Sequence, residues 1–337
     1  MTPKRSICFV ITLFLFNAKS FTSTDIVDIG SLRALPLGQF NTYFKSALRI
    51  RGLPDGNLMV VDNVDSTIEY LSPQGKVLKR IGKPGQGPGD LNHPYHVWVG
   101  ESEIYVSDDE AVSRFDLRGN YIDRFKDFRG ISGLTASNDR VYVVEEYADC
   151  LITSYGLRGE KKAAFGKRYS VGSSPRQADG IPDWVLHMGS VLYLDGHIYF
   201  VSHLFGDIFK YDLAGNLMNK RMDLESPKAA ENRSIVFEKK EKKISIHNRL
   251  FNDIIIYKNK IYALEYVRRG SEGHIWEIDP VTLTPNRKFR FLSPGPGQFV
   301  ECISFFIRQA GQKTEVLISY YDFNEGDICI GIARINI

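Results

Sequence analysis

Apolar and polar residues alternate in short stretches along most of the chain, and these stretches recur. Six of them begin at a polar turn and continue as a run rich in β-branched and aromatic residues. They span residues 57–61, 103–107, 140–144, 197–201, 260–264 and 315–319. Short runs of this kind, separated by turn signals, are typical of an all-β array.

The spacing of the six runs indicates a structural repeat. Their central residues serve as anchors: Met59, Tyr105, Tyr142, Tyr199, Tyr262 and Val316. Successive anchors are 46, 37, 57, 63 and 54 residues apart. A period near 50 residues fits the four-stranded blades of a propeller. We therefore predict an all-β fold, a six-bladed β-propeller with four-stranded antiparallel blades, which fills residues 21–337 as a single domain.

A second phrase supports the same repeat. It consists of an aromatic residue, two or three turn-forming residues, a Gly and a polar residue that leads into a new strand. Copies occupy residues 68–77, 113–122, 153–160 and 209–217, and a fifth copy at 276–280 has lost the Gly. Gly suits this position because a tight hairpin turn often needs a positive φ.

The same pattern predicts how the ring closes. After the sixth anchor only one more strand remains, at 328–335, so the last blade lacks its outermost strand. Residues 25–29 have strand character and no blade of their own. We predict that they complete the last blade, which would remove two open sheet edges.

The two longest steps contain insertions, at about 169–185 and 223–246. The second includes a run of charged residues at 238–243, which we expect to form a solvated loop or the face of a hairpin. No long segment has convincing helical periodicity, which disfavours a parallel α/β fold.

The first twenty residues have the order of a secretory signal. Lys4 and Arg5 precede an apolar run at 7–16, and Ala18 and Ser20 follow it as small residues at alternate positions. The run is too short to cross a bilayer, which takes roughly 20 residues. We predict cleavage after Ser20 and a location in the periplasm or outside the cell. A strand at the start of the fold is the alternative.

The cysteines indicate neither a lipid anchor nor a disulfide framework. Cys8 lies at the beginning of the apolar run, whereas a lipid-anchored protein needs a Cys directly after it. Cys150, Cys302 and Cys329 are an odd number at irregular spacing, and we expect them to be buried free thiols.

Composition and motifs exclude some classes of function. The chain of 337 residues carries 43 Lys and Arg against 40 Asp and Glu, a net charge of +3. So small a surplus gives no electrostatic case for nucleic acid as the main partner. The sequence has no G-x-S-x-G, H-E-x-x-H or C-x-x-C motif. We expect a monomer whose mature chain does not span a membrane.

Two glycine- and proline-rich loops carry a family resemblance. Residues 82–94 and 291–299 resemble the inter-blade loops of NHL-repeat propellers. With the N-terminal segment, they make the chain similar to the secreted six-bladed TolB-like propellers common in Bacteroidetes. The resemblance implies the six-bladed fold for nearly the whole chain. It implies no single activity, because NHL-like propellers include binding modules, gluconolactonase-type hydrolases and amidoglycolate lyases.

Polar residues gather where the innermost strands of the blades should begin, at one mouth of the central channel. All blades converge there, so a ligand would meet residues from several of them. We predict a ligand-binding site formed by Arg49, Arg51, His93, His96, Trp184, His187, His247, Arg249, Asp253 and Glu301. The alternative is that the histidines are unrelated surface or turn residues.

Three functional hypotheses follow. The leading one is a non-catalytic binding or scaffold propeller, without a cofactor, that recognises a protein, a peptide or a glycan at the channel mouth. The second is a metal-assisted hydrolase or lyase in which His93, His187 and His247 hold a divalent metal such as zinc or calcium. The third is a purely structural partner in an envelope complex, which predicts an exposed apolar patch and no formed pocket.

Overall fold

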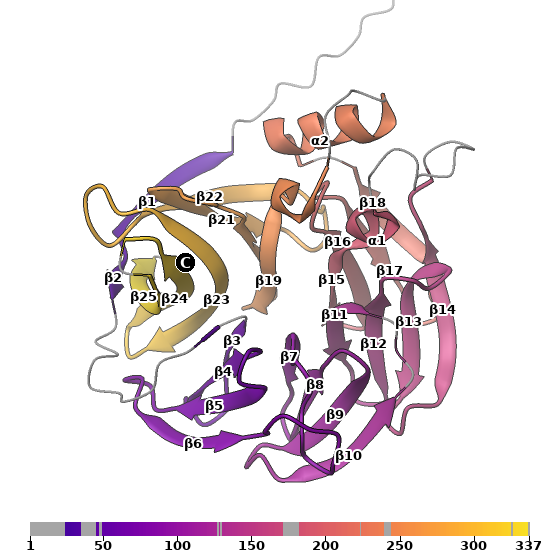
Figure 1. Cartoon of the computed structure of the whole chain (residues 1–337). Coiled ribbons are helices and arrows are strands. Elements are labelled where there is room, and N and C mark those ends of the chain that lie inside the picture. The colour runs from indigo at the N-terminus through magenta and orange to yellow at the C-terminus, as the bar shows by residue number, and fades with distance from the viewer. Residues whose placement is uncertain are drawn as a thin grey trace, which may run out of the picture.

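The computed structural model describes residues 24–34, 45–46, 49–126, 128, 130–170, 182–222, 224–238, 244–324 and 326–335. The signal segment predicted for residues 1–20 lies outside these ranges, as does most of the charged run. The described strands form six small sheets arranged in a ring around a central channel (Figure 1). The six-bladed propeller predicted from the sequence is therefore confirmed.

Each of the first three blades runs outward from the channel in chain order. Blade 1 contains β3 (Arg49–Gly52), β4 (Leu58–Asp62), β5 (Thr67–Leu71) and β6 (Val77–Ile81). Blade 2 contains β7 (His96–Val99), β8 (Glu103–Ser107), β9 (Ala111–Asp116) and β10 (Tyr121–Lys126). Blade 3 contains β11 (Ile131–Ala136), β12 (Arg140–Glu145), β13 (Cys150–Gly156) and β14 (Lys161–Lys167).

The other three blades follow the same order. Blade 4 contains β15 (Gly189–Leu194), β16 (His197–Ser202), β17 (Ile208–Tyr211) and β18 (Leu217–Arg221). Blade 5 contains β19 (Phe251–Tyr257), β20 (Lys260–Glu265), β21 (Glu272–Ile278) and β22 (Pro285–Leu292). Blade 6 contains the long strands β23 (Val300–Ala310), β24 (Lys313–Asp322) and β25 (Asp327–Ile335). All six predicted runs are the second strands of their blades.

The N-terminal segment closes the last blade, as predicted, but with other residues than those predicted. β2 (Arg33–Ala34) pairs with β25 as the outermost strand of blade 6. Residues 25–29 belong instead to β1 (Asp25–Ser31), which pairs in parallel with β22 as a fifth strand of blade 5. The reason is apolar contact: Val27 and Ile29 pack against the core between blades 5 and 6. Only the two residues of β2 then remain to pair with β25.

The hydrophobic core lies between neighbouring blades. In β12, Tyr142 and Val144 pack in the layer shared with blade 4, whereas Val141 and Val143 pack in the layer shared with blade 2. Equivalent layers fill all six gaps of the ring. Because successive side chains of a strand point to opposite faces, a strand buried on both faces reads as a nearly continuous apolar run. This explains why the second strands gave the clearest repeat.

The predicted hairpin turns join the third and fourth strands of their blades. Gly75, Gly119, Gly159 and Gly215 all have φ between 78° and 89°, a conformation that strains residues with a Cβ. In the copy that lost its Gly, Leu283 takes the left-handed conformation at φ 59°. The loops at 82–94 and 291–299 each lead from the fourth strand of one blade to the innermost strand of the next.

The insertions carry helices, which were not predicted from the sequence; the loop or hairpin expected at 238–243 lies almost wholly outside the described residues. α1 (Asp183–His187) ends the first insertion, and α2 (Pro227–Phe237) and the 3-10 turn η3 (Ile246–Asn248) belong to the second. Ser226 caps α2, and Pro227 stands at its first position. Ile235, Val236 and Leu186 pack with Phe205 in a separate small core beside blade 4. These few apolar residues do not produce the periodic pattern by which a helix is predicted from sequence.

Within the described residues, no helix combines the length and apolar character needed to cross a membrane. Cys150, Cys302 and Cys329 are free thiols, of which Cys302 is buried and the other two are half-buried.

Candidate functional site at the channel mouth

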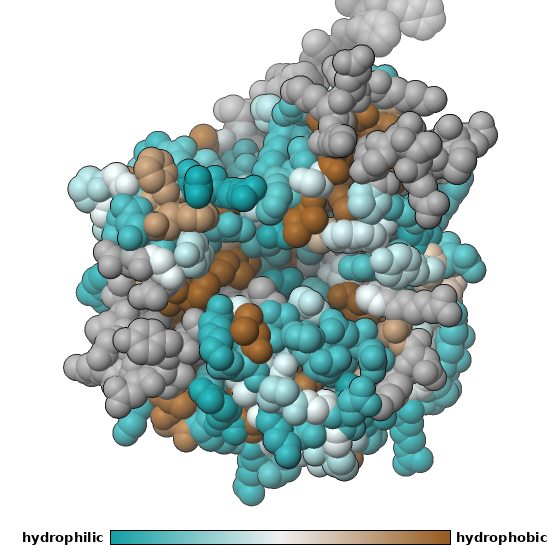
Figure 2. Space-filling model, viewed as in Figure 1, coloured by the Kyte–Doolittle hydropathy of each residue, from teal (hydrophilic) through white to brown (hydrophobic). Residues whose placement is uncertain are grey.

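Two cavities follow one another along the central channel. The first has a volume of about 790 Å³ and lies where the innermost strands begin; we call it the mouth cavity. The second, of about 260 Å³, lies further along the same strands and is called the channel cavity. The register of β3 gives this order, since Arg49 lines the mouth cavity and Arg51 lines the channel cavity. Figure 2 shows one face of the ring, which is hollowed near its centre.

All six blades contribute to the mouth cavity. Residues within one position of the start of each innermost strand line it: Arg49, His96, Ile131, Met188, Asn252 and Glu301. The formed pocket disagrees with the hypothesis of a purely structural protein, which predicted none.

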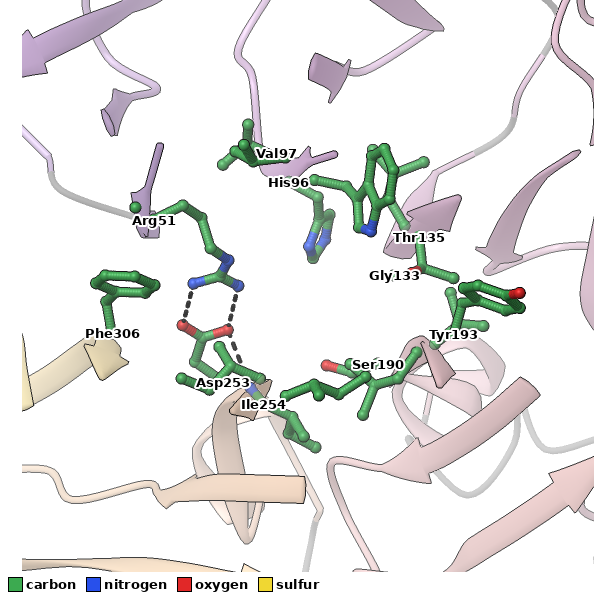
Figure 3. A pocket seen from close by; sticks show the side chains of 18 residues that line it. Arg51, His96, Val97, Gly133, Thr135, Ser190, Tyr193, Asp253, Ile254 and Phe306 are labelled. Carbon is green, nitrogen blue, oxygen red and sulfur yellow. Dashed lines mark hydrogen bonds and ion pairs between the residues drawn. The ribbon is translucent and has the colours of Figure 1, made fainter. Parts of the chain in front are cut away.

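A buried cluster of charged side chains spans the channel between blades 1, 5 and 6. Arg51 donates two hydrogen bonds to the Asp253 carboxylate, from Nη1 to Oδ2 at 2.9 Å and from Nη2 to Oδ1 at 2.8 Å (Figure 3). Ser304 donates its hydroxyl to the same carboxylate, and Arg49 Nε lies 3.7 Å from Asp253 Oδ1. One carboxylate thus links three blades at the axis of the ring.

Asp253 remains ionised although it is fully buried. Burial by itself would raise the pKa of its carboxyl group. The positive charges of Arg51 and Arg49, with the hydrogen bonds from Arg51 and Ser304, outweigh burial and lower the pKa of Asp253 to about 2. Burial also lowers the pKa of Arg49 to about 10, which leaves this guanidinium charged at neutral pH.

Two histidines lie beside this cluster and are held neutral. His96 lines both cavities, and His203 lines the mouth cavity directly after β16. Burial, and then the positive charge of Arg49, lowers the pKa of both imidazoles, to about 3 for His203. His203 Nε2 lies 2.9 Å from Ser190 Oγ. These contacts fix the imidazole of His203 between the two cavities.

One wall of the mouth cavity carries Arg249. Its guanidinium carbon lies 4.2 Å from the centre of the Tyr266 ring. Tyr266 donates its hydroxyl to Glu301 Oε1 at 3.1 Å, and His247 Nδ1 lies 3.1 Å from the same hydroxyl. Arg249 Nε is buried and has no hydrogen-bond acceptor in the part of the chain that the structure describes.

Another wall, from blades 2 and 3, is acidic. Glu146 follows β12 and lines the mouth cavity, and burial raises the pKa of its carboxyl group. The carboxylate lies over Gly130, where an added Cβ would approach Oε2 to 2.6 Å. Asp109 lines the same cavity and pairs with His93 Nδ1 at 3.0 Å.

Aromatic rings complete the mouth cavity: Tyr95, Tyr147, Trp184 and Tyr321 line it. Tyr95 and Tyr147 are exposed, with 40% and 60% of their surface accessible. Trp184 is half-buried, because it also packs against the small core of the insertions.

The structure brings together seven of the ten predicted site residues. Each of these seven lines one of the two cavities: Arg49, Arg51, His96, Trp184, Arg249, Asp253 and Glu301. His93, His187 and His247 line neither cavity. His187 is buried in the insertion, where its Nδ1 lies 2.7 Å from Arg168 Nη2 and 2.8 Å from the carbonyl oxygen of Asp183.

The three histidines proposed as metal ligands have separate partners. His93 pairs with Asp109, His187 contacts Arg168, and His247 contacts Tyr266. Among the described residues, no three His, Cys, Asp or Glu side chains are grouped so that they could hold a metal ion. The residues therefore do not fit the metal centre of the second hypothesis.

Sequence reasoning missed His203, Glu146, Tyr147 and Asn252. Three of these directly follow the second strand of a blade: β12 ends at Glu145 and β16 at Ser202. In an antiparallel blade the second strand ends beside the start of the first, so its next residues return to the mouth. Polar residues after each second strand were the signal that could have identified them.

No protein-family model matches the chain, and no curated protein matches it. Its fold is similar to that of several solved structures. A member of the DUF4221 family from Bacteroides vulgatus has 13% identity and a TM-score of 0.56, covering 90% of this chain and 96% of its own. A candidate exported protein from Bacteroides fragilis has 11% identity and a TM-score of 0.55, covering 93% and 99%.

An enzyme has the same architecture. A catalytically inactive virginiamycin B lyase from Staphylococcus aureus, with quinupristin, has 11% identity and a TM-score of 0.52, covering 88% of this chain and 97% of its own. At such low identity these likenesses establish the propeller fold alone.

Proposed function

We propose that this protein is a non-catalytic binding propeller whose ligand, a peptide, a glycan or a segment of a protein, occupies the mouth cavity. One observation carries the proposal: the mouth cavity combines the accessible rings of Tyr95 and Tyr147 with two charged side chains, Glu146 and Arg249, neither of which forms an ion pair among the described residues. A concave site with a few well-placed polar groups is the usual form of a ligand pocket. Its volume of about 790 Å³ suits a ligand of several linked residues or sugars.

The charged groups of the channel favour binding over turnover. Asp253 is held by Arg51, Arg49 and Ser304, so its carboxylate is already neutralised within the protein. His203 is buried and oriented by Ser190. These groups form a rigid floor beneath the mouth cavity rather than a set of free acids and bases.

The compartment is part of the proposal. The N-terminal order of basic, apolar and small residues supports export, and the similarity to a candidate exported protein of Bacteroides fragilis agrees with it. The loops at 82–94 and 291–299 support an assignment to the NHL-repeat or TolB-like type. The exported protein would then meet its partner in the periplasm or outside the cell.

Arrays of peptides and glycans, probed with the purified protein, test the proposal. We expect a set of ligands that the wild type binds and that Tyr95→Ala loses by roughly tenfold or more, since aromatic anchors dominate such sites. Tyr193→Ala is the matched control, because Tyr193 lines the channel cavity instead. No binding to any array, or equal binding by Tyr95→Ala and the wild type, would contradict a ligand site at the mouth.

Metal analysis of the purified protein tests the alternative of a metal-assisted enzyme. Stoichiometric zinc or calcium that is lost in His93→Ala or His247→Ala would revive that alternative. If the protein only binds a ligand, as proposed, we expect no stoichiometric zinc or calcium in the wild type.

A further inference from the structure

Glu146 is a carboxylate without a partner inside the mouth cavity. Within the described part of the chain, no cation lies within 4 Å of the carboxylate, and no hydrogen bond reaches Oε1 or Oε2. Arg168 Nη2 donates to the main-chain carbonyl oxygen of Glu146 instead, at 2.9 Å. Burial is the sole cause of its raised pKa. A half-buried carboxylate costs free energy until a cation or a donor meets it.

The second unsatisfied charge is Arg249. Its guanidinium stacks on Tyr266 but forms no ion pair within 4 Å among the described residues. Glu301 acts on it electrostatically, yet Glu301 Oε1 accepts its hydrogen bond from Tyr266. The buried Nε is left without an acceptor. The guanidinium of Arg249 thus lines the cavity without an anionic partner among the described residues, and a carboxylate or a carbonyl oxygen of a ligand would supply one.

The two charges do not neutralise each other, although they line the same cavity. Glu146 follows the second strand of blade 3, whereas Arg249 precedes the first strand of blade 5. Blade 4 and the insertion before it lie between them, and Met188, Trp184 and His203 of these segments line the wall. The cavity thus has Glu146 and Asp109 on one side of this wall and Arg249, with Glu301 near it, on the other.

We propose that the mouth cavity binds a short zwitterionic peptide, with its ammonium group at Glu146 and its carboxylate at Arg249. This inference rests on the proposed function and names the class of ligand. A peptide with free termini carries both charges, and its side chains supply apolar contact for Trp184. Tyr95, whose pKa is raised by burial and then by the charges of Asp109 and Glu146, adds an aromatic face near these carboxylates.

The test compares peptides whose ends are blocked one at a time. Tripeptides Ala-Leu-Ala and Ala-Tyr-Ala, with free termini, are titrated into the purified protein and followed by saturation-transfer NMR and calorimetry. The same peptides are then used with an acetylated amino end or an amidated carboxyl end. In the wild type we expect each block to weaken binding by about tenfold or more, the usual effect of losing one charge-assisted hydrogen bond.

Two variants identify which end lies at which residue. Glu146→Gln is expected to bind more weakly and to become insensitive to acetylation, while amidation still weakens binding. Arg249→Met is expected to show the opposite pattern. The matched controls are Glu101→Gln and Arg118→Met, at exposed positions outside the cavity. The blocked peptides test the wild type directly, so the result stands even if a variant fails to fold.

Several outcomes would overturn the inference. One is equal binding of blocked and free peptides. Another is binding of phosphocholine, a zwitterion of another class, where the peptides do not bind. If glycans on the array bind and Tyr95→Ala loses them while the peptides fail, the binding function stands and the peptide inference falls. If no ligand of either class depends on Tyr95, both fall.

Discussion

Single residues in the channel differ in whether their charge is matched within the protein. Asp253 is matched by Arg51, Arg49 and Ser304, and it is fully buried. Glu146 and Arg249 line the mouth cavity, and neither forms an ion pair among the described residues. Charges that are paired within the protein hold the blades together, whereas unpaired charges are available to a ligand. Substitutions at the two kinds of position should therefore affect different measurements.

Asp253→Asn should strongly destabilise the fold. The change removes the negative charge but leaves Arg51 and Arg49 buried beside it, and breaking a buried ion pair in this way costs about 3–5 kcal/mol. Urea unfolding followed by circular dichroism measures the effect. Asp195→Asn is the control, because Asp195 is an exposed turn residue at φ 48°, where Asn is well tolerated. Equal stability of the two variants would show that the cluster at the axis is not a structural link.

Stability should fall on acidification between pH 6.5 and 4.5. The pKa of His203 is lowered to about 3 in the folded state, and an unfolded histidine titrates near 6.5. In this interval the unfolded chain binds a proton that the folded protein does not, so the free energy of unfolding decreases as the pH falls. The limit is about 1.4 kcal/mol per pH unit for each histidine.

Urea unfolding at several pH values checks this slope, and His203→Gln isolates its source. The variant should lose part of the slope and retain the part due to His96, whose pKa is also lowered. The interval from pH 6.5 to 4.5 lies above the range in which the Asp253 carboxyl group titrates, so Asp253 does not contribute to the slope. An unchanged slope in His203→Gln would mean that this histidine is not buried in its neutral form.

At the scale of elements, the strands that sequence reasoning identified best are those buried on both faces. β12 and β16 were predicted because each has four consecutive apolar residues between polar ends. Residues 25–29 of β1 were assigned to the wrong blade and β2 was not predicted, because a strand at the edge has few apolar residues to fix its register. α2 was missed, since only Ala229, Ile235 and Val236 of its apolar residues reach a core.

The same argument applies to the site. Arg49, His96 and Arg249 were predicted from their place at the start of an innermost strand, a position that the blade repeat determines. His187 and His247 lie in insertions, where the repeat no longer fixes the register, and both occupy other surroundings. Glu146 and His203 lie far from the innermost strands in the sequence and reach the mouth only through the fold. The repeat could have identified them only as the residues that follow the second strands.

Leu32 should be the main contact through which the N-terminal strands stabilise the ring. It is 2% exposed and packs in the layer between blades 5 and 6. Leu32→Ala should cost about 2–5 kcal/mol of unfolding free energy, as expected when a buried leucine is truncated. Ile26→Ala is the control, since Ile26 is 63% exposed on the adjacent strand. The two denaturation midpoints would coincide only if the N-terminal strands were not packed on the ring.

At the scale of the whole molecule, the ring and its insertions have distinct parts in the candidate site. The six innermost strands converge on the channel and supply the buried floor. The two insertions, one with α1 and the other with η3, lie beside blade 4 and bring Trp184 and Ile246 to the mouth cavity. The repeat thus provides a rigid frame, and the irregular segments add specificity to one wall.

Export should leave the closed ring intact, because the predicted cleavage site precedes every helix and strand that the structure describes. Cleavage after Ser20 would leave Phe21 as the first residue, and β1 begins at Asp25. N-terminal sequencing of the protein from the periplasmic or extracellular fraction of producing cells should therefore begin at Phe21. Leu13→Arg places a charge in the apolar run and should retain the full-length chain inside the cell, since the apolar run is what the export machinery recognises. Recovery of an uncleaved chain from the exported fraction, or of cleaved protein with Leu13→Arg, would show that residues 1–20 are not a signal.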